Sequence, residues 1–136
     1  MKTLSRIAVS LVVVGLAAAG LGFWIVPEQM AQMFEITGVS GHGLVNLRAD
    51  YGGLFLGAAV LAGAGVWTKH RGGVVAAAVI LGLAVVGRLI GGITAGVAAM
   101  GVLELAFELL ALTSLIVYAR THGVGNEAGR TGRPAL

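Results

Sequence analysis

The fold is decided by residues 73–119, which read GVVAAAVILGLAVVGRLIGGITAGVAAMGVLELAFELLALTSLIVYA. This stretch is almost wholly apolar, and it is too long for one membrane-crossing helix, which needs about 20 residues. It therefore predicts two spanning helices with a tight turn near residues 94–101. Three charges interrupt it, at Arg88, Glu104 and Glu108. A charge at bilayer depth costs at least roughly 2.5–3.5 kcal/mol on insertion scales, so these positions need an explanation.

Two further apolar runs come earlier in the chain, and together the four runs predict an all-α, integral membrane four-helix bundle. The chain is 57% hydrophobic and 11% charged, whereas a soluble domain carries about 25% charged residues. A single transmembrane domain over residues 1–136 is expected. Its predicted spans are residues 4–26, 44–67, 73–95 and 99–119, with an outer loop at 27–43, a basic turn at 68–72 and a flexible tail at 120–136.

The basic residues outside the membrane core predict the orientation. They are Lys2, Arg6, Lys69, Arg71, Arg120, Arg130 and Arg133. With four spans, all of them fall on one side, and the two loops on the other side carry no Lys or Arg. The positive-inside rule then places both termini in the cytoplasm. The net charge of +3 does not indicate nucleic acid, because these residues flank the spans and form no patch.

The N-terminal run has a second interpretation. Lys2 and Arg6, then apolar residues, then three alanines at 17–19 are similar to a secretory signal peptide. The run over residues 4–26 is long for a signal core. A cleaved chain would keep three spans in the same orientation, so both alternatives stay open.

Five charged side chains lie within the predicted spans, and the predicted orientation places all of them in the outer half of the membrane. They are Arg48, Asp50, Arg88, Glu104 and Glu108, two positive and three negative. Glu104 and Glu108 are four residues apart and share a helix face. Pairs such as Arg88–Glu108 and Arg48–Glu104 would hold the four helices in register. Alternatively, the same charges line a binding cavity.

Other side chains near this layer are candidates for ligand contact or packing. Tyr51 follows Asp50 and is expected to hydrogen-bond a carboxylate or a ligand. Small residues allow helices to approach closely in membranes. The glycines expected to do so are Gly52, Gly53, Gly57, Gly91 and Gly92. Trp24, Trp67 and Tyr118 stand near span ends, which is typical of an interfacial aromatic belt.

The sequence contains no pattern typical of catalysis. The chain has no Cys, which excludes disulfides, thiolate nucleophiles and Cys metal sites. It carries no nucleotide-binding loop, no HExxH sequence and no cluster of Cys and His. We therefore expect no catalytic residue, metal or cofactor, and a protein that is not an enzyme.

Residues 46–53, NLRADYGG, resemble the opening of the second span in a bacterial family of small four-span membrane proteins, domain of unknown function 4345. The resemblance covers about residues 4–120. It extends to Pro27, the segment from Phe34 to Gly38, Gly87-Arg88, and Glu104 or Glu108. Its most specific part is the Arg-x-x-Tyr-Gly-Gly block formed by Arg48, Tyr51, Gly52 and Gly53. The resemblance implies the four-span fold in a bacterial inner membrane and no established activity.

Taken together, these patterns predict a non-enzymatic membrane protein. We expect it to bind a lipid-like or small amphipathic ligand, or a membrane partner, through Arg48, Tyr51, Arg88, Glu104 and Glu108. The arginines suit an anionic or hydrogen-bonding head group, and the small residues suit its tail. The alternative is a proton-coupled small transporter or channel that acts as an oligomer.

Overall fold

A computed structural model describes residues 2–95 and 99–122, and within these residues the chain consists of helices and short connections. The elements are α1 (Lys2–Ile25), α2 (Pro27–Met33), α3 (Gly41–Leu47), the π-helical turn η1 (Arg48–Gly52), α4 (Gly53–Trp67), α5 (Arg71–Ala95) and α6 (Ala99–His122). The elements α3, η1 and α4 follow one another without a break. The predicted all-α fold is confirmed for the described residues.

Among the described residues, four helical segments are long and apolar enough to cross a membrane. They are Thr3–Ile25, Gly41–Trp67, Arg71–Thr94 and Gly101–His122. The predicted spans match them closely, but three boundaries differ. The outer segment 27–43 holds α2 and the start of α3 rather than a loop alone, the basic turn is shortened because α5 begins at Arg71, and α6 continues through residues 120–122 of the predicted tail. Residues 96–98, in the predicted turn, and 123–136 lie outside the described residues.

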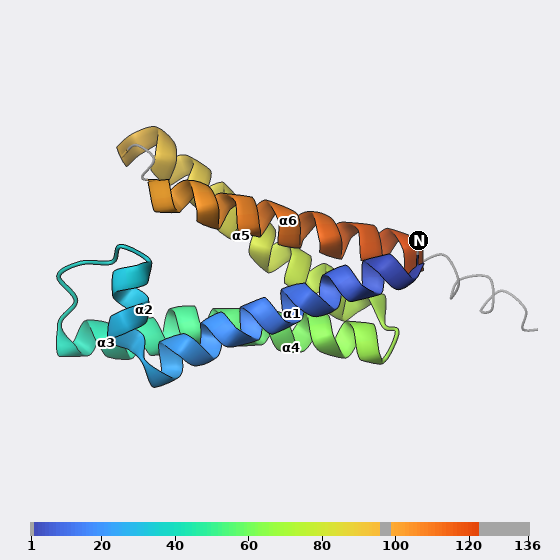
Figure 1. The fold of residues 1–136 in the computed structure, drawn as a ribbon, viewed down its shortest axis with the longest axis horizontal. Helices are drawn as coiled ribbons and strands as arrows, with labels where there is room; N and C mark the ends of the chain where they lie inside the picture. Colours follow the sequence, from blue (N-terminus) through green and yellow to red (C-terminus); the bar gives the residue numbers. More distant parts are fainter. Residues whose placement is uncertain (1, 96–98, 123–136) are drawn as a thin grey trace, which may run out of the picture.

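The four long helices alternate in direction around a ring. α1 packs against α4, α4 against α5, α5 against α6, and α6 against α1. The start of α1, the α4–α5 turn and the end of α6 lie at one end of the molecule (Figure 1). We call this the terminal end. The opposite end, with α2, α3, the end of α5 and the start of α6, is called the distal end.

The hydrophobic core is shared by all four long helices only toward the terminal end. It includes Val9, Leu16, Ala58, Ala62, Val74, Ala77, Leu81, Ala111, Leu115 and Tyr118. A second, smaller cluster lies at the distal end around Phe23, Ala31 and Leu47. Its members come from α1, α2, α3, α4 and the α2–α3 connection, and none comes from α5 or α6. The distal part of the α5–α6 hairpin accordingly diverges from α1 and α4 (Figure 1).

The short helix α2 is set by its boundary residues. α1 ends before Pro27, which lacks an N–H and suits the first position of α2. α2 ends at Met33 with Phe34 as its C-cap, and the connection turns at Glu35 and Gly38, both with positive φ. The Ser40 side-chain oxygen then accepts a hydrogen bond from the Gly43 N–H (3.3 Å) and starts α3. This path folds Phe34 back over the end of α1.

Glycines allow α4 and α5 to cross closely near their connecting turn. A Cβ added at Gly73 would lie 2.4 Å from the carbonyl oxygen of Leu61, and one at Gly65 would lie 2.8 Å from the Val74 nitrogen. Neither backbone atom moves without shifting its helix. At Gly53, Gly57 and Gly91, by contrast, an added Cβ would meet nothing within 4 Å. The predicted close packing at these three positions is therefore wrong, while that of Gly92 stays a prediction.

Tyr118 is not the interfacial residue that its position near a span end predicts. It is 2% exposed, and its hydroxyl donates a hydrogen bond to the carbonyl of Val66 (3.5 Å). Its ring stacks on His122 at 4.1 Å between centroids. Trp67 is 88% exposed, and its place in an interfacial belt stays a prediction.

The crossing of α4 and α5 can be tested by adding one methyl group. Gly73→Ala should lower the free energy of unfolding by about 1–3 kcal/mol, the usual cost of overpacking. Gly82→Ala is the matched control on the same helix, because a Cβ there meets nothing within 4 Å. Thermal unfolding in mild detergent measures both, and equal midpoints would contradict the crossing.

Candidate functional site

One arginine on α5 joins two carboxylates of α6. The Arg88 Nε–H donates to Glu108 Oε2 (3.0 Å), and its Nη2 donates to Glu108 Oε1 (2.9 Å). The third guanidinium nitrogen, Nη1, donates to Glu104 Oε2. Arg88 therefore binds Glu108 with two parallel hydrogen bonds, the strongest arrangement for this pair, and also forms an ion pair with Glu104. We call Arg88, Glu104 and Glu108 the ion triad.

Burial within the ion triad increases along α6. The side chains of Arg88 and Glu104 are 30% and 19% exposed, whereas that of Glu108 is 7% exposed. Glu108 lies one turn from Ala111, a member of the shared core. Glu104 lies one turn nearer the distal end, where the core no longer continues. The ion triad thus marks the boundary between the packed half of the bundle and its open half.

Two cavities meet at this boundary, with volumes of about 330 and 230 Å³. Both are bordered by Phe34, Phe55, Leu81, Arg88 and Glu108. The larger also reaches Tyr51, Leu54, Ala58, Ile80 and Ala84, between α4 and α5. The smaller reaches Ala19, Met33, Leu103, Glu104 and Phe107, between α1 and α6. We refer to the two together as the distal cleft.

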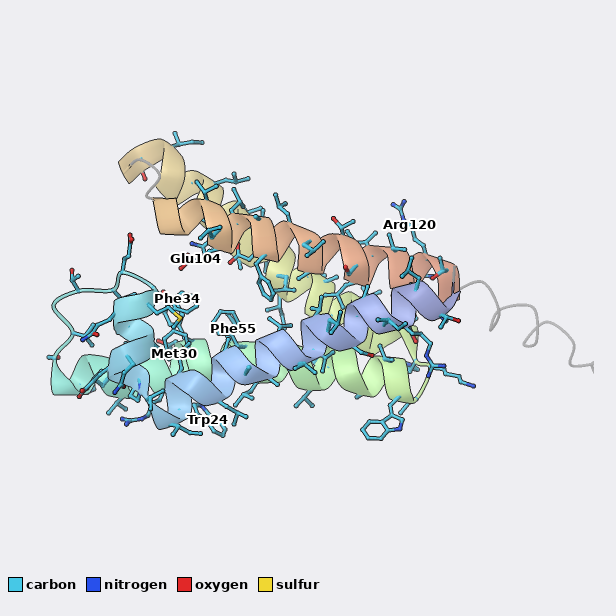
Figure 2. The ribbon with its side chains drawn as sticks, viewed as in Figure 1. Trp24, Met30, Phe34, Phe55, Glu104 and Arg120 are labelled. Carbon is cyan, nitrogen blue, oxygen red and sulfur yellow. The ribbon has the colours of Figure 1, made fainter. Side chains whose placement is uncertain are left out.

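Aromatic rings form the side of the distal cleft that faces the ion triad. Phe23 lies 5.2 Å from both Phe34 and Tyr51 and 6.1 Å from Phe55, measured between ring centroids. Phe55 lies 6.3 Å from Phe34 and 6.5 Å from Tyr51. Figure 2 shows Glu104 pointing from α6 toward the side on which Phe34 and Phe55 lie. The cleft therefore has a charged wall on the α5–α6 hairpin and, opposite it, an aromatic wall formed by Phe34, Tyr51 and Phe55, behind which Phe23 packs.

Arg48 does not form the predicted pair with Glu104. Its Nε–H donates to the carbonyl of Trp24 (3.2 Å), and the indole N–H of Trp24 donates to the carbonyl of Arg48 (3.0 Å). Gly52 makes room for this contact, because a Cβ there would lie 2.3 Å from Trp24 Cδ1. The prediction fails because α1 stays packed on η1 at the distal end while the α5–α6 hairpin diverges. The expected close packing at Gly52 is confirmed.

Of the other two predicted site residues on η1, Tyr51 borders the distal cleft and Asp50 does not. Asp50 is exposed, does not border the distal cleft and makes no ion pair with a described residue. Tyr51 borders the larger cavity, and its ring packs on Phe23. The structure thus brings Tyr51, Arg88, Glu104 and Glu108 to one cleft and leaves Arg48 and Asp50 outside it.

The aromatic wall was missed as part of the site. In the sequence, Phe34 is one apolar residue within a polar segment, and Phe55 belongs to a long apolar run. Nothing in such runs distinguishes a ring facing a cleft from one facing lipid. Among the described residues, no group of three or more His, Cys, Asp or Glu side chains is placed to hold a metal ion.

Comparisons with protein-family models, curated proteins and solved structures found no match for this chain. The resemblance to the four-span bacterial family therefore stays a prediction.

The two glutamates should differ in their contribution to stability. Glu108→Gln should lower the free energy of unfolding by about 2–3 kcal/mol, because it weakens two hydrogen bonds to a charged partner in a buried site. Glu104 is more exposed and accepts one such bond, so Glu104→Gln should lower the free energy of unfolding by about 1 kcal/mol or less. Denaturant unfolding of the two isosteric variants gives the comparison, and a larger loss for Glu104→Gln would refute this ranking.

Proposed function

We propose that this chain is an integral membrane protein that crosses the bilayer four times, with both termini in the cytoplasm. The four long apolar segments support the crossings. The orientation is supported by charge, since Lys69 and Arg71 lie at the α4–α5 turn and Arg120 in the last turn of α6, all at the terminal end. The connection between α1 and α3 carries Glu28 and Glu35 and no Lys or Arg. Basic residues at the terminal end favour its cytoplasmic placement in a bacterial inner membrane.

Its function, on this proposal, is to bind a small amphipathic molecule in the distal cleft without chemical conversion. The observation that carries the proposal is the distal cleft, where cavities of about 330 and 230 Å³ have apolar and aromatic linings and a few polar groups on one side. Ligand sites in proteins have this composition, with apolar walls for affinity and convergent polar groups for orientation. The ion triad and the hydroxyl of Tyr51 are the polar groups available.

The packed apolar core between the distal cleft and the terminal end favours binding over transport. Toward the terminal end the core is filled by Leu81, Ala111, Leu115 and Tyr118 together with residues of α1 and α4. Among the described residues, only Ser5 and Glu108 are buried polar or charged ones. A polar molecule or ion moving through the bundle would need groups to replace its water, and this core offers almost none.

Filling the distal cleft should abolish ligand retention. The double variant Ala19→Leu/Ala84→Leu adds bulk to one lining residue of each cavity. Its matched control is Ala18→Leu/Val86→Leu, which changes exposed neighbours on the same two helices. Native mass spectrometry of protein released from gentle detergent should show a discrete bound mass on the native and control proteins, and bare protein for the filled variant.

Two results would contradict the proposal. A bound mass that persists in the filled variant, while that variant unfolds at the temperature of its control, would place the ligand elsewhere. Bare protein in all three samples, before and after supplementation with a membrane lipid extract, would leave the cleft without a ligand.

A further inference from the structure

We propose that the molecule bound in the distal cleft is an amphipathic organic cation, whose alkylammonium head lies between Glu104 and the rings of Phe34 and Phe55. This inference rests on the proposed function of the cleft and adds the chemical class of its ligand. It differs from the sequence-based expectation of an anionic head group, for reasons that lie in the hydrogen bonds of the ion triad.

The first reason is the charge of the cleft. Among the described residues that border it, the charged ones are Arg88, Glu104 and Glu108. With all three ionised, one positive and two negative charges give a sum of −1. In a low-dielectric site, an unbalanced charge is costly and favours a ligand of opposite sign. A singly charged cation would bring the cleft to neutrality.

The second reason is that Arg88 is already engaged. Each of its three nitrogens donates a hydrogen bond to a carboxylate oxygen of Glu104 or Glu108. An anionic head would have to compete with two carboxylates that are held in place on α6. Arg88 contacts Glu104 through Oε2, which leaves Oε1 as an acceptor for a ligand in the smaller cavity, where Glu104 forms part of the lining.

The third reason is the aromatic wall. Phe34 and Phe55 border the same cavity as Glu104, and Phe23 and Tyr51 pack beside them. The faces of aromatic rings attract cations, and alkylammonium groups are the ligands typically bound by several rings together. A carboxylate and rings facing the same cavity suit such a head better than a neutral or anionic one.

The rest of the lining suits an apolar tail. The larger cavity continues past Leu54, Ala58, Ile80 and Ala84, all apolar. Because the two cavities share Phe34, Phe55 and Leu81, a head group near Glu104 leaves this neighbouring space for an alkyl chain. The occupant is therefore an amphiphile rather than a compact polar cation.

Three probes with the same ten-carbon tail test the head group. They are decyltrimethylammonium, the uncharged isostere decyldimethylamine oxide at pH 8, and decanesulfonate. Isothermal titration calorimetry into the full chain in zwitterionic lipid nanodiscs, with protein-free nanodiscs subtracted, should give at least tenfold tighter binding of the cation than of the amine oxide, and weakest binding of the sulfonate.

Glu104→Gln should reduce the preference for the cation over the amine oxide to less than threefold. Glu28→Gln removes one negative charge without altering the distal cleft, since Glu28 borders neither of its cavities, so it should keep the preference. Phe34→Leu should weaken binding of the cation more than binding of the amine oxide, and it tests the aromatic wall without any change of charge.

The outcomes separate the two proposals. Equal binding of all three probes, lost in Ala19→Leu/Ala84→Leu, would overturn the cationic head but keep an amphiphile site. Tightest binding of the sulfonate would also overturn the cationic head and would indicate that Arg88 binds the head group of the ligand. Binding of none of the probes, together with bare protein in native mass spectrometry, would overturn the proposed function itself.

Discussion

Arg88 forms hydrogen bonds with two carboxylates of the neighbouring helix at the level where the four-helix core ends. Charges in an apolar bundle must be paired, and here the pairing takes place within the α5–α6 hairpin. Because all three guanidinium nitrogens of Arg88 find their hydrogen-bond partners within the hairpin, Arg88 needs no polar contact with α1 or α4. The ion triad thus does not hold all four helices in register. It stabilises one helix pair and leaves a cleft beside it.

The other helix pair has its own distal contact. Trp24 on α1 and Arg48 on η1 exchange hydrogen bonds, and a Cβ at Gly20 would lie 3.0 Å from the Gly52 carbonyl oxygen. The molecule is therefore two helix pairs that share one core at the terminal end and are held separately at the distal end. α2 places Phe34 at the opening between them. A cleft between two internally stabilised pairs can admit a ligand without loss of either pair.

Much of this fold could be predicted from the sequence, because four apolar runs of spanning length determine the number and extent of the long helices. The pairing of Arg88 with Glu108 also followed from their predicted depth. The same reasoning also predicted the pair Arg48–Glu104, which is wrong. Two residues at the same depth can pair only if their helices stay in contact there, and depth alone does not predict which helices separate. That separation depends on side-chain packing around Phe23, Phe34 and Phe55, and apolar residues in an apolar run carry no pattern that reveals it. The five charges already sum to −1 in the sequence, but only the structure assigns three of them to the cleft and Arg48 to Trp24.

The central claim is that ligand binding requires the ion triad, whereas apolar side chains in its place would stabilise the α5–α6 pair at least as well. The most direct measurement replaces it with apolar residues of similar length, Arg88→Met/Glu104→Met/Glu108→Met, and compares thermal unfolding and decyltrimethylammonium binding with those of the native protein. Buried ion triads can be exchanged for apolar side chains with little loss, and often a gain, in stability. We predict an unfolding midpoint at or above that of the native protein and loss of the binding preference for the cation. A midpoint well below that of the native protein, with the preference retained, would show that the ion triad is structural.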